Sequence, residues 1–360
     1  MSLKLKQTRQ SIDKIDREIT KLINKRALLA LDAAKVKNGT YNKGDTVIYV
    51  PSREREVLKK VTSIKGILEK EALKNIYTEI ISACRNLEKL TKVAFLGPWA
   101  SFTHQAAIRN FGSSVCFVPV ATAQEVITEI ESGRVSFGVV PVENSNEGSV
   151  NIVLDTFVET ELKICAEVSL KIEQCFLVKE SKSKIVRIYS HPHALAQCNN
   201  WVTKNYPDVE LISVCSTAEA AKKIAKEGFA AAIASEAAAK MYNLRVLQKG
   251  IQDNVENFTR FFVIGKSLAK PSGGDKTSLI FMVKNKVGAL HNILGIFSKH
   301  NVDLTKIESR PTKKKAWEYV FFIDFKGHVN DKSIMKMVKI LKQNCVFMKI
   351  LGSYPIAWGL

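Results

Sequence analysis

The sequence shows no pattern typical of a disulfide-stabilised or zinc-binding protein. Its seven cysteines are scattered along the chain, odd in number and never arranged as Cys-x-x-Cys. This usage is typical of reduced thiols in a cytosol rather than of a disulfide framework or a metal site. We therefore expect a cytoplasmic protein without a structural metal.

Long apolar runs are also absent. No stretch approaches the ~18 apolar residues that a membrane-spanning helix needs, and residues 1–14 are polar and cationic, so neither a membrane span nor a signal peptide is expected. The apolar share of 46% is ordinary for a globular protein. At 360 residues the chain exceeds what one hydrophobic core usually organises, which predicts two or three domains.

Acidic residues are the scarcer charge. There are 35 of them against 54 lysines and arginines, which gives a net charge of +19. Such an excess can indicate nucleic-acid binding. However, the lysines are spread over the whole chain, and the densest run, Lys313–Lys315, follows a proline as in an exposed loop. We interpret the charge as a lysine-rich surface that favours small dianions and expect no nucleic-acid partner; specific binding at physiological salt would favour that alternative.

Changes in sequence pattern divide the chain into three parts. In residues 1–91, apolar side chains recur at helical spacing from Ile12 to about Lys37. A second helix is predicted to begin with Ser52 as its N-cap, and a third to span about 72–90. This part is expected to be all-helical.

Residues 92–268 alternate between short apolar strands and helical stretches, which predicts an α/β domain. After a linker at 270–275, residues 277–360 give the order β-α-β-β-α-β, with one helix predicted at 289–299. This order is the ferredoxin-like motif. The strands predicted in the α/β part lie at 93–96, 135–140, 185–189 and 230–234.

Cations lie on the apolar face of the first predicted helix. Arg26 projects from that face, and Lys37 follows about three turns later on the same side. Arg53 and Glu54 stand at the start of the next helix. A lone arginine at such an edge usually extends outward to water, whereas two inward cations suit an anion pocket; the pattern alone leaves both interpretations open.

Together with Arg9 and the segment Ile80–Arg85, these residues resemble the all-helical chorismate mutase family over residues 3–90. The resemblance implies an intertwined dimer, in which the residue matching Arg9 reaches the partner's site. It also implies conversion of chorismate to prephenate without a cofactor, with cations holding the two carboxylates. The substrate-binding residues that it implies are Arg9, Arg26, Lys37, Arg53, Glu54, Cys84 and Glu88.

Three positions depart from that family. Val50 stands where an Asp is frequent, Cys84 where Ser is frequent, and Glu88 where several members carry Gln. That Gln, with the lysine matched by Lys37, donates to the ether oxygen, so Lys37 and Glu88 are the expected catalytic pair. A carboxylate cannot donate, so Glu88 has to be protonated, with a pKa above the usual ~4.3. These departures leave a weak mutase module as an alternative.

Polar groups recur where the predicted α/β strands end. Ser101 and Ser190 are expected as helix N-caps, whose free amides bind carboxylates. Residues 139–148 leave an apolar strand into a polar loop, and Thr259-Arg260 stands at the start of another apolar run. Buried polar groups cost free energy unless they are hydrogen-bonded. Each feature alone is explained by capping or turn formation; together they predict a ligand cleft.

These segments resemble prephenate dehydratase over about residues 92–267. The resemblance implies two α/β lobes, like a small periplasmic-binding-protein fold, with a site between them that converts prephenate to phenylpyruvate. Thr259 would donate to the leaving hydroxyl, relayed from Glu143. Arg260 would bind substrate or only brace its loop. The substrate-binding residues that it implies are Ser101, Thr103, Asn144, Ser145, Ser190, Gln197, Arg260 and Phe261.

This dehydratase part also departs from its family. Trp99-Ala100 stands where Glu-Gly is usual, and His193 where Gln is usual. His191 and His193 have a spacing that can suit a metal, but they fall at a helix start without a third ligand nearby in sequence, so no metal is expected.

Residues 277–356 resemble an ACT regulatory domain of the phenylalanine-binding kind. Gly288-Ala-Leu begins a helix and Glu308-Ser-Arg-Pro closes a strand, although Val287 replaces the usual proline. The resemblance implies that phenylalanine binds between paired domains and lowers dehydratase activity. The effector-binding residues that it implies are Gly288, Ala289, Leu290, Glu308, Ser309 and Arg310.

The sequence therefore predicts a multidomain protein with an all-α chorismate mutase module at 1–91, an α/β two-lobed periplasmic-binding-protein-like dehydratase domain at 92–268, and an α+β ferredoxin-like ACT domain at 277–360. We expect a bifunctional enzyme, isomerase and lyase, that acts on chorismate and prephenate as a homodimer or higher homo-oligomer. The alternatives are a dehydratase with a degenerate mutase module and a non-catalytic phenylalanine-sensing binding protein.

Overall fold

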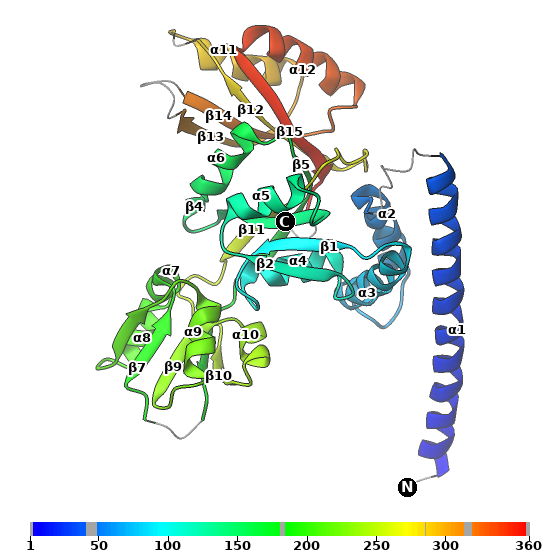
Figure 1. The fold of residues 1–360 in the computed structure, drawn as a ribbon, viewed down its shortest axis with the longest axis vertical. Helices are drawn as coiled ribbons and strands as arrows, with labels where there is room; N and C mark the ends of the chain where they lie inside the picture. The colour runs from blue at the N-terminus through cyan, green and yellow to red at the C-terminus, as the bar shows by residue number, and fades with distance from the viewer. Residues whose placement is uncertain (1–2, 41–48, 181–183, 285, 313–318, 358–360) are drawn as a thin grey trace. The chain divides into compact units, whose positions relative to one another are not determined.

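The structure is a computed structural model that describes residues 3–40, 49–180, 184–284, 286–312 and 319–357 (Figure 1). The predicted loop at Lys313–Lys315 lies outside these residues, as does the side chain of Lys37. The chain forms two compact units, 1–91 with 111–116 and 92–110 with 117–360. Within the described ranges, no helix is both long and apolar enough to cross a membrane.

The first unit contains three helices, α1 (Leu3–Thr40), α2 (Pro51–Thr62) and α3 (Lys70–Glu88), and α3 packs against both of the others. Val50 is the N-cap of α2 and Pro51 its first residue, so the predicted Ser52 cap is wrong by two positions. Proline suits the first position because its missing N–H would be unpaired there anyway. Along α1, Ile12, Ile15 and Leu22 are half-exposed or more.

The second unit begins with a six-stranded sheet of order β2-β1-β3-β11-β5, in which β4 also pairs with β3. Strand β11 runs antiparallel to both β3 and β5, whereas β1 and β3 are parallel. The elements of this lobe are β1 (Lys92–Leu96), α4 (Phe102–Phe111), β2 (Cys116–Val120), α5 (Ala123–Glu131), β3 (Phe137–Asn144), β4 (Gly148–Ser149), α6 (Asn151–Glu159), β5 (Lys163–Lys171) and β11 (Phe258–Gly265).

A five-stranded sheet of order β10-β6-β9-β7-β8 forms the second lobe. The chain enters this lobe after β5 and returns to the first through β11, so two connections join the lobes, as the predicted two-lobed domain requires. The elements of this lobe are β6 (Cys175–Val178), β7 (Arg187–Ser190), α7 (Pro192–Gln197), α8 (Asn199–Asn205), β8 (Glu210–Ser213), α9 (Thr217–Ile224), β9 (Ala230–Ala234), α10 (Glu236–Met241) and β10 (Arg245–Lys249).

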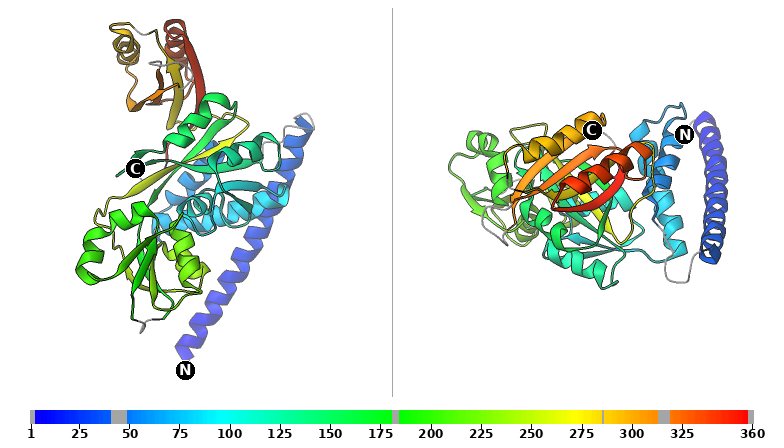
Figure 2. Two further views of the ribbon diagram at one scale, coloured as in Figure 1. Left: turned by 60° about the vertical axis from the view of Figure 1, so that its left-hand side comes forward. Right: turned by 90° about the horizontal axis from the view of Figure 1, so that it is seen from above.

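The C-terminal part follows the predicted β-α-β-β-α-β order, which is confirmed, and its sheet has the order β13-β14-β12-β15. Helices α11 and α12 cover one face of this sheet (Figure 2). On the other face, Ile280, Phe322 and Leu351 share a hydrophobic core with the first lobe. The elements are β12 (Asp275–Met282), α11 (Ala289–Lys299), β13 (Leu304–Pro311), β14 (Tyr319–Lys326), α12 (Lys332–Asn344) and β15 (Phe347–Pro355).

Strand β15 approaches β5 of the first lobe closely at Gly352. A Cβ atom at Gly352 would lie 2.2 Å from the backbone oxygen of Ile164. Two strands from different sheets cannot separate here without opening the shared core. Only glycine therefore fits at position 352 without displacing the neighbouring backbone.

We expect Gly352→Ala to lower the free energy of unfolding by about 1–3 kcal/mol, because overpacking must displace backbone. Chemical denaturation of the full chain measures this. Gly295→Ala is the matched control, since Gly295 lies in α11 with nothing within 4 Å of the added Cβ; it should be neutral or stabilising by up to about 1 kcal/mol. Equal destabilisation by both would contradict the close-approach explanation.

Candidate active sites

A network of amide side chains surrounds Thr259 between the two lobes. Thr259 lies opposite Asn144 in the β11–β3 register. The Nδ2 of Asn144 donates to Thr259 Oγ1 at 2.8 Å and to Asn257 Oδ1 at 2.9 Å. The Nδ2 of Asn257 in turn donates to Gln197 Oε1 at 3.0 Å. Because its oxygen accepts from Asn144, the threonine hydroxyl keeps its proton for another partner.

The loop after β3 contacts helix α7 of the other lobe. The carboxylate of Glu147 accepts from Gln197 Nε2 at 2.8 Å and also contacts His193 Nδ1. Ser145 Oγ accepts from the Phe258 amide at 3.0 Å. The expected residues Asn144, Ser145, Gln197 and Thr259 are thus brought together, and Glu147 is a carboxylate in this network that sequence reasoning missed.

The start of α7 differs from the prediction. Its N-cap is His191, whose Nδ1 accepts from the His193 amide at 3.3 Å. Ser190 is buried and donates to the Ile233 carbonyl at 2.6 Å, so its expected capping role is wrong. Burial, and to a smaller extent His193, lowers the pKa of His191, which favours the neutral ring. Among the described side chains, no group of three or more His, Cys, Asp or Glu could hold a metal.

Helix α4 begins as predicted. Ser101 Oγ accepts from the His104 amide at 3.2 Å, and Thr103 is buried in the first turn. From the second lobe, Ser235 Oγ donates to the Ala100 carbonyl at 3.2 Å. Burial lowers the pKa of His104. The start of α4 is therefore held against the second lobe through the loop that precedes it.

Glu143 and Arg260 lie on the other face of the sheet. The two residues are opposite each other in register: Glu143 directly precedes Asn144, and Arg260 directly follows Thr259. Successive residues of a strand point to opposite faces, so this pair faces away from the amide network. Glu143 pairs with Lys306 at 3.0 Å and with Arg260 at 3.4 Å. Glu143 is therefore not placed to relay a proton to Thr259, which corrects that expectation.

Arg260 is likewise not placed to bind substrate. Its Nε donates to Glu167 at 2.7 Å, and its Nη1 donates to Asp324 at 2.5 Å. The bracing role is the one the structure supports. Phe261, expected to bind substrate, is 1% exposed and belongs to the core.

In the first unit, Glu54 and Arg85 form a buried ion pair. Arg85 Nη1 donates to Glu54 Oε1 at 2.5 Å, and Nη2 donates to the Phe111 carbonyl at 2.5 Å. Burial raises the pKa of Glu54, which Arg85 and Arg26 oppose and Glu88 reinforces. The structure thus brings Arg26, Glu54 and Glu88 within electrostatic reach of one another. Arg85 belongs to the segment that carries the family resemblance, but the sequence interpretation assigned it no role in the site.

The other residues expected in the mutase site are placed differently. Arg53 lies on the exposed side of α2 and pairs with Glu56 at 2.7 Å, so it does not join Glu54. Cys84 is buried in α3, and Arg9 is exposed on α1. Of the residues expected in the mutase site, Arg26 of α1, Glu54 of α2 and Glu88 of α3 are therefore the ones that lie within electrostatic reach of one another.

The two expected effector motifs lie in different environments. Gly288 caps α11 with a φ of 76°, followed by Ala289 and Leu290. On β13, Glu308 accepts from Ser149 Oγ at 2.9 Å, and Arg310 pairs with Asp155 at 3.1 Å. Glu308 and Arg310 therefore contact the first lobe, whereas Ser309 between them is exposed.

We expect Ala100→Gly to raise the free energy of unfolding by about 1 kcal/mol, because Ala100 has a φ of 62° and a side chain is disfavoured in the left-handed region. Thermal or chemical unfolding measures this. Ala221→Gly, inside helix α9, is the opposite control and should be destabilising by about 1 kcal/mol. Destabilisation by Ala100→Gly would show that the alanine side chain is needed there.

Comparison with known proteins gives matches along the chain. Family models match at residues 8–89 (chorismate mutase type II), 93–268 (prephenate dehydratase) and 277–342 (ACT domain). Curated proteins named bifunctional chorismate mutase/prephenate dehydratase from Aquifex aeolicus and Pseudomonas aeruginosa are 48% and 45% identical, each match covering 98% of both chains.

A solved structure is also similar. Prephenate dehydratase from Arthrobacter aurescens in complex with L-Phe matches with a TM-score of 0.69 and 31% identity, over 74% of this chain and 90% of that one. The relatives at 45–48% identity span nearly the whole length. The chain belongs to the bifunctional chorismate mutase/prephenate dehydratase family.

Proposed function

We propose that this chain converts chorismate to prephenate in its helical unit and prephenate to phenylpyruvate between its two α/β lobes, with phenylalanine as inhibitor. The observation that carries the proposal is the amide network from Gln197 to Thr259, which joins both lobes within the range of the dehydratase family model. A site whose polar groups come from two lobes can enclose a small dianion and exclude water.

In the dehydration, the enzyme has to assist the departure of the 4-hydroxyl group. As the carboxylate on the ring leaves as carbon dioxide, its bonding electrons enter the ring and expel the 4-hydroxyl, and the ring becomes aromatic. A threonine hydroxyl is a weak acid, so Thr259 acts as a hydrogen-bond donor to the departing oxygen. Asn144 orients the Thr259 hydroxyl by donating a hydrogen bond to its oxygen, which leaves the hydroxyl proton for the departing group. The helix start at Ser101 and Thr103 is proposed to bind a carboxylate.

The mutase reaction is a rearrangement that needs positioning rather than covalent chemistry. Arg26 and Lys37 are proposed to hold the substrate carboxylates, and Glu88 with Lys37 to serve the ether oxygen. Burial, reinforced by the neighbouring Glu88, raises the pKa of Glu54. Arg85 is proposed to position Glu54.

The exposed surface of α1 and the comparisons with similar proteins support a proposal for assembly and regulation. Half-exposed apolar side chains along α1, such as Ile12 and Leu22, support a homodimer in which Arg9 of the partner subunit completes the site. The ACT match and the L-Phe complex of a relative support phenylalanine as effector, with the Gly288 helix start as the proposed carboxylate site. The cysteines carry free thiols, which supports a cytosolic location.

Single substitutions should separate the two reactions. Arg26→Ala is expected to lower mutase kcat/KM at least ~100-fold and spare dehydration, and Thr259→Ala to do the reverse, because each removes one group that binds charge developing in its own site. Prephenate and phenylpyruvate are followed after adding chorismate, or prephenate alone, to the full chain. Arg17→Ala, on an exposed side of α1, is the control. Equal loss of both activities in either variant would contradict separate sites.

The pH profile tests the role of Glu88. If protonated Glu88 donates, mutase kcat/KM should decline as pH rises through neutrality, since deprotonation removes the donor. Glu88→Gln, which donates at every pH, should show a flatter profile between about pH 5 and 9. Identical profiles for wild type and variant would exclude this role. Low activity throughout in both would favour the dehydratase with a weak mutase module.

A further inference from the structure

We propose that Arg260 and Glu143 carry the regulatory signal from the C-terminal sheet to Thr259 and Asn144. The inference rests on the proposed inhibition by phenylalanine and names the route by which an effector on that sheet would reach the dehydratase site. Its elements are adjacent strands β3 and β11, whose two faces serve different partners.

The alternation of side chains on these strands places the two pairs back to back. Thr259 and Asn144 are hydrogen-bonded at 2.8 Å on the face that carries the amide network. Arg260 and Glu143 are the next residues on the same strands, opposite each other in register, and face the C-terminal sheet. A shift of the Arg260–Glu143 pair therefore moves the backbone that holds the threonine and its asparagine.

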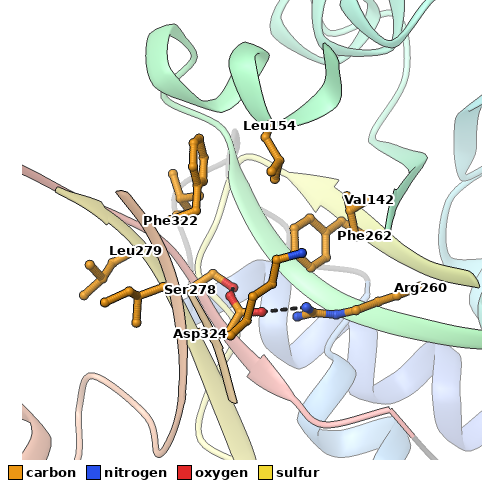
Figure 3. Close-up of a pocket in the computed structure, with 11 residues that line it drawn as sticks. Val142, Leu154, Arg260, Phe262, Ser278, Leu279, Phe322 and Asp324 are labelled. Carbon is orange, nitrogen blue, oxygen red and sulfur yellow. Dashed lines mark hydrogen bonds and ion pairs between the residues drawn. The ribbon is translucent and has the colours of Figure 1, made fainter. Parts of the chain in front are cut away.

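The C-terminal sheet contacts this pair through charged side chains. Asp324 of β14 accepts from Arg260 (Figure 3). Lys306 of β13 pairs with Glu143 at 3.0 Å. Glu167 of β5 pairs with both Arg260, at 2.7 Å, and Lys276 of β12, at 3.1 Å. The cluster balances three carboxylates with three cations, and breaking one partner would leave a buried charge uncompensated.

A directed chain of hydrogen bonds makes the contact sensitive to position. Ser278 Oγ donates to Asp324 at 2.5 Å, which uses its single proton. The Tyr354 hydroxyl, whose pKa is raised by burial, therefore donates to Ser278 and accepts from Arg260 Nη2 at 3.0 Å. Arg260 is thus fixed by two residues of the C-terminal sheet, one on β14 and one on β15.

A small pocket borders this cluster. Its lining includes Arg260, Phe262, Lys306, Phe322 and Asp324, from both sheets (Figure 3). Packed cores change between discrete arrangements rather than deforming continuously. A displacement of the C-terminal sheet would therefore change the partners of Arg260 in a discrete step, because Asp324 and Tyr354 hold it from that sheet.

A second set of contacts offers a competing route. Arg310 of β13 pairs with Asp155 of α6 at 3.1 Å, and Glu308 with Ser149 of β4. These contacts also join the C-terminal sheet to the first lobe, but they do not involve β11. Substitutions at Asp324 or Tyr354 and at Asp155 therefore discriminate the two routes.

The experiment measures dehydratase rates of the full chain on prephenate, without and with saturating phenylalanine, and phenylalanine binding by equilibrium dialysis. In Asp324→Asn and in Tyr354→Phe, which keeps the buried ring, the ratio of the two rates should fall about fivefold or more toward one. Bound phenylalanine should remain near wild type in both variants, and in Tyr354→Phe, which keeps every charge of the cluster, so should the rate without phenylalanine. Asp303→Asn is the matched control, since Asp303 pairs with Lys326 on an exposed surface of the same sheet and should keep the full ratio.

Three results would overturn the proposal. The first is full inhibition in both variants with phenylalanine bound. The second is loss of inhibition in Asp155→Asn alone, which would assign the signal to α6. The third is found with the wild type by itself: if phenylalanine does not bind or does not inhibit, the proposed effector role fails, and the route fails with it. If Asp324→Asn does not fold, Tyr354→Phe decides between these outcomes.

Discussion

The antiparallel register of β3 and β11 is the constraint on which the dehydratase part of this protein depends. It sets Thr259 opposite Asn144 and, one residue away, Arg260 opposite Glu143. Because side chains alternate, a shift of one residue would place the arginine on the face of the amide network and the threonine among carboxylates. The register is supported on the other side of β11 by β5, whose Glu167 meets Arg260. Chemistry and domain contact are thereby fixed together.

Both units use a buried arginine to hold distant segments. Arg85 joins Glu54 of α2 to the Phe111 carbonyl, and Arg260 joins β5 to β14. A planar guanidinium has several donors in fixed directions, so one side chain can satisfy partners from separate elements. Replacing such a cluster by apolar residues can cost little stability. Such a replacement would, however, remove the coupling between the positions of the segments that the arginine joins.

Much of this organisation could be predicted from the sequence, because local signals determine it. The helix at 289–299 and the strand at 230–234 coincide with their predicted bounds. It could not be predicted which face of β3 carries Glu143 and which carries Asn144. Apolar and polar residues flank both positions alike, and the partner strand comes more than a hundred residues later. Arg85 was missed for a related reason: its carbonyl partner belongs to Phe111, far along the chain. The face to which a strand residue points, and its pairing with residues far away in sequence, are both set by tertiary contacts.

The C-terminal sheet differs from a domain attached by a flexible linker. Its Ile280, Phe322 and Leu351 belong to the same hydrophobic core as Phe262 of β11, and Gly352 lies against the backbone of β5. Contacts between domains of one chain are usually smaller and more polar, which allows independent motion. A shared apolar core opposes such motion, so displacement of the sheet must be accompanied by rearrangement of the first lobe. An effector site on this sheet is thereby placed where its occupancy can alter the strands that carry Thr259 and Asn144.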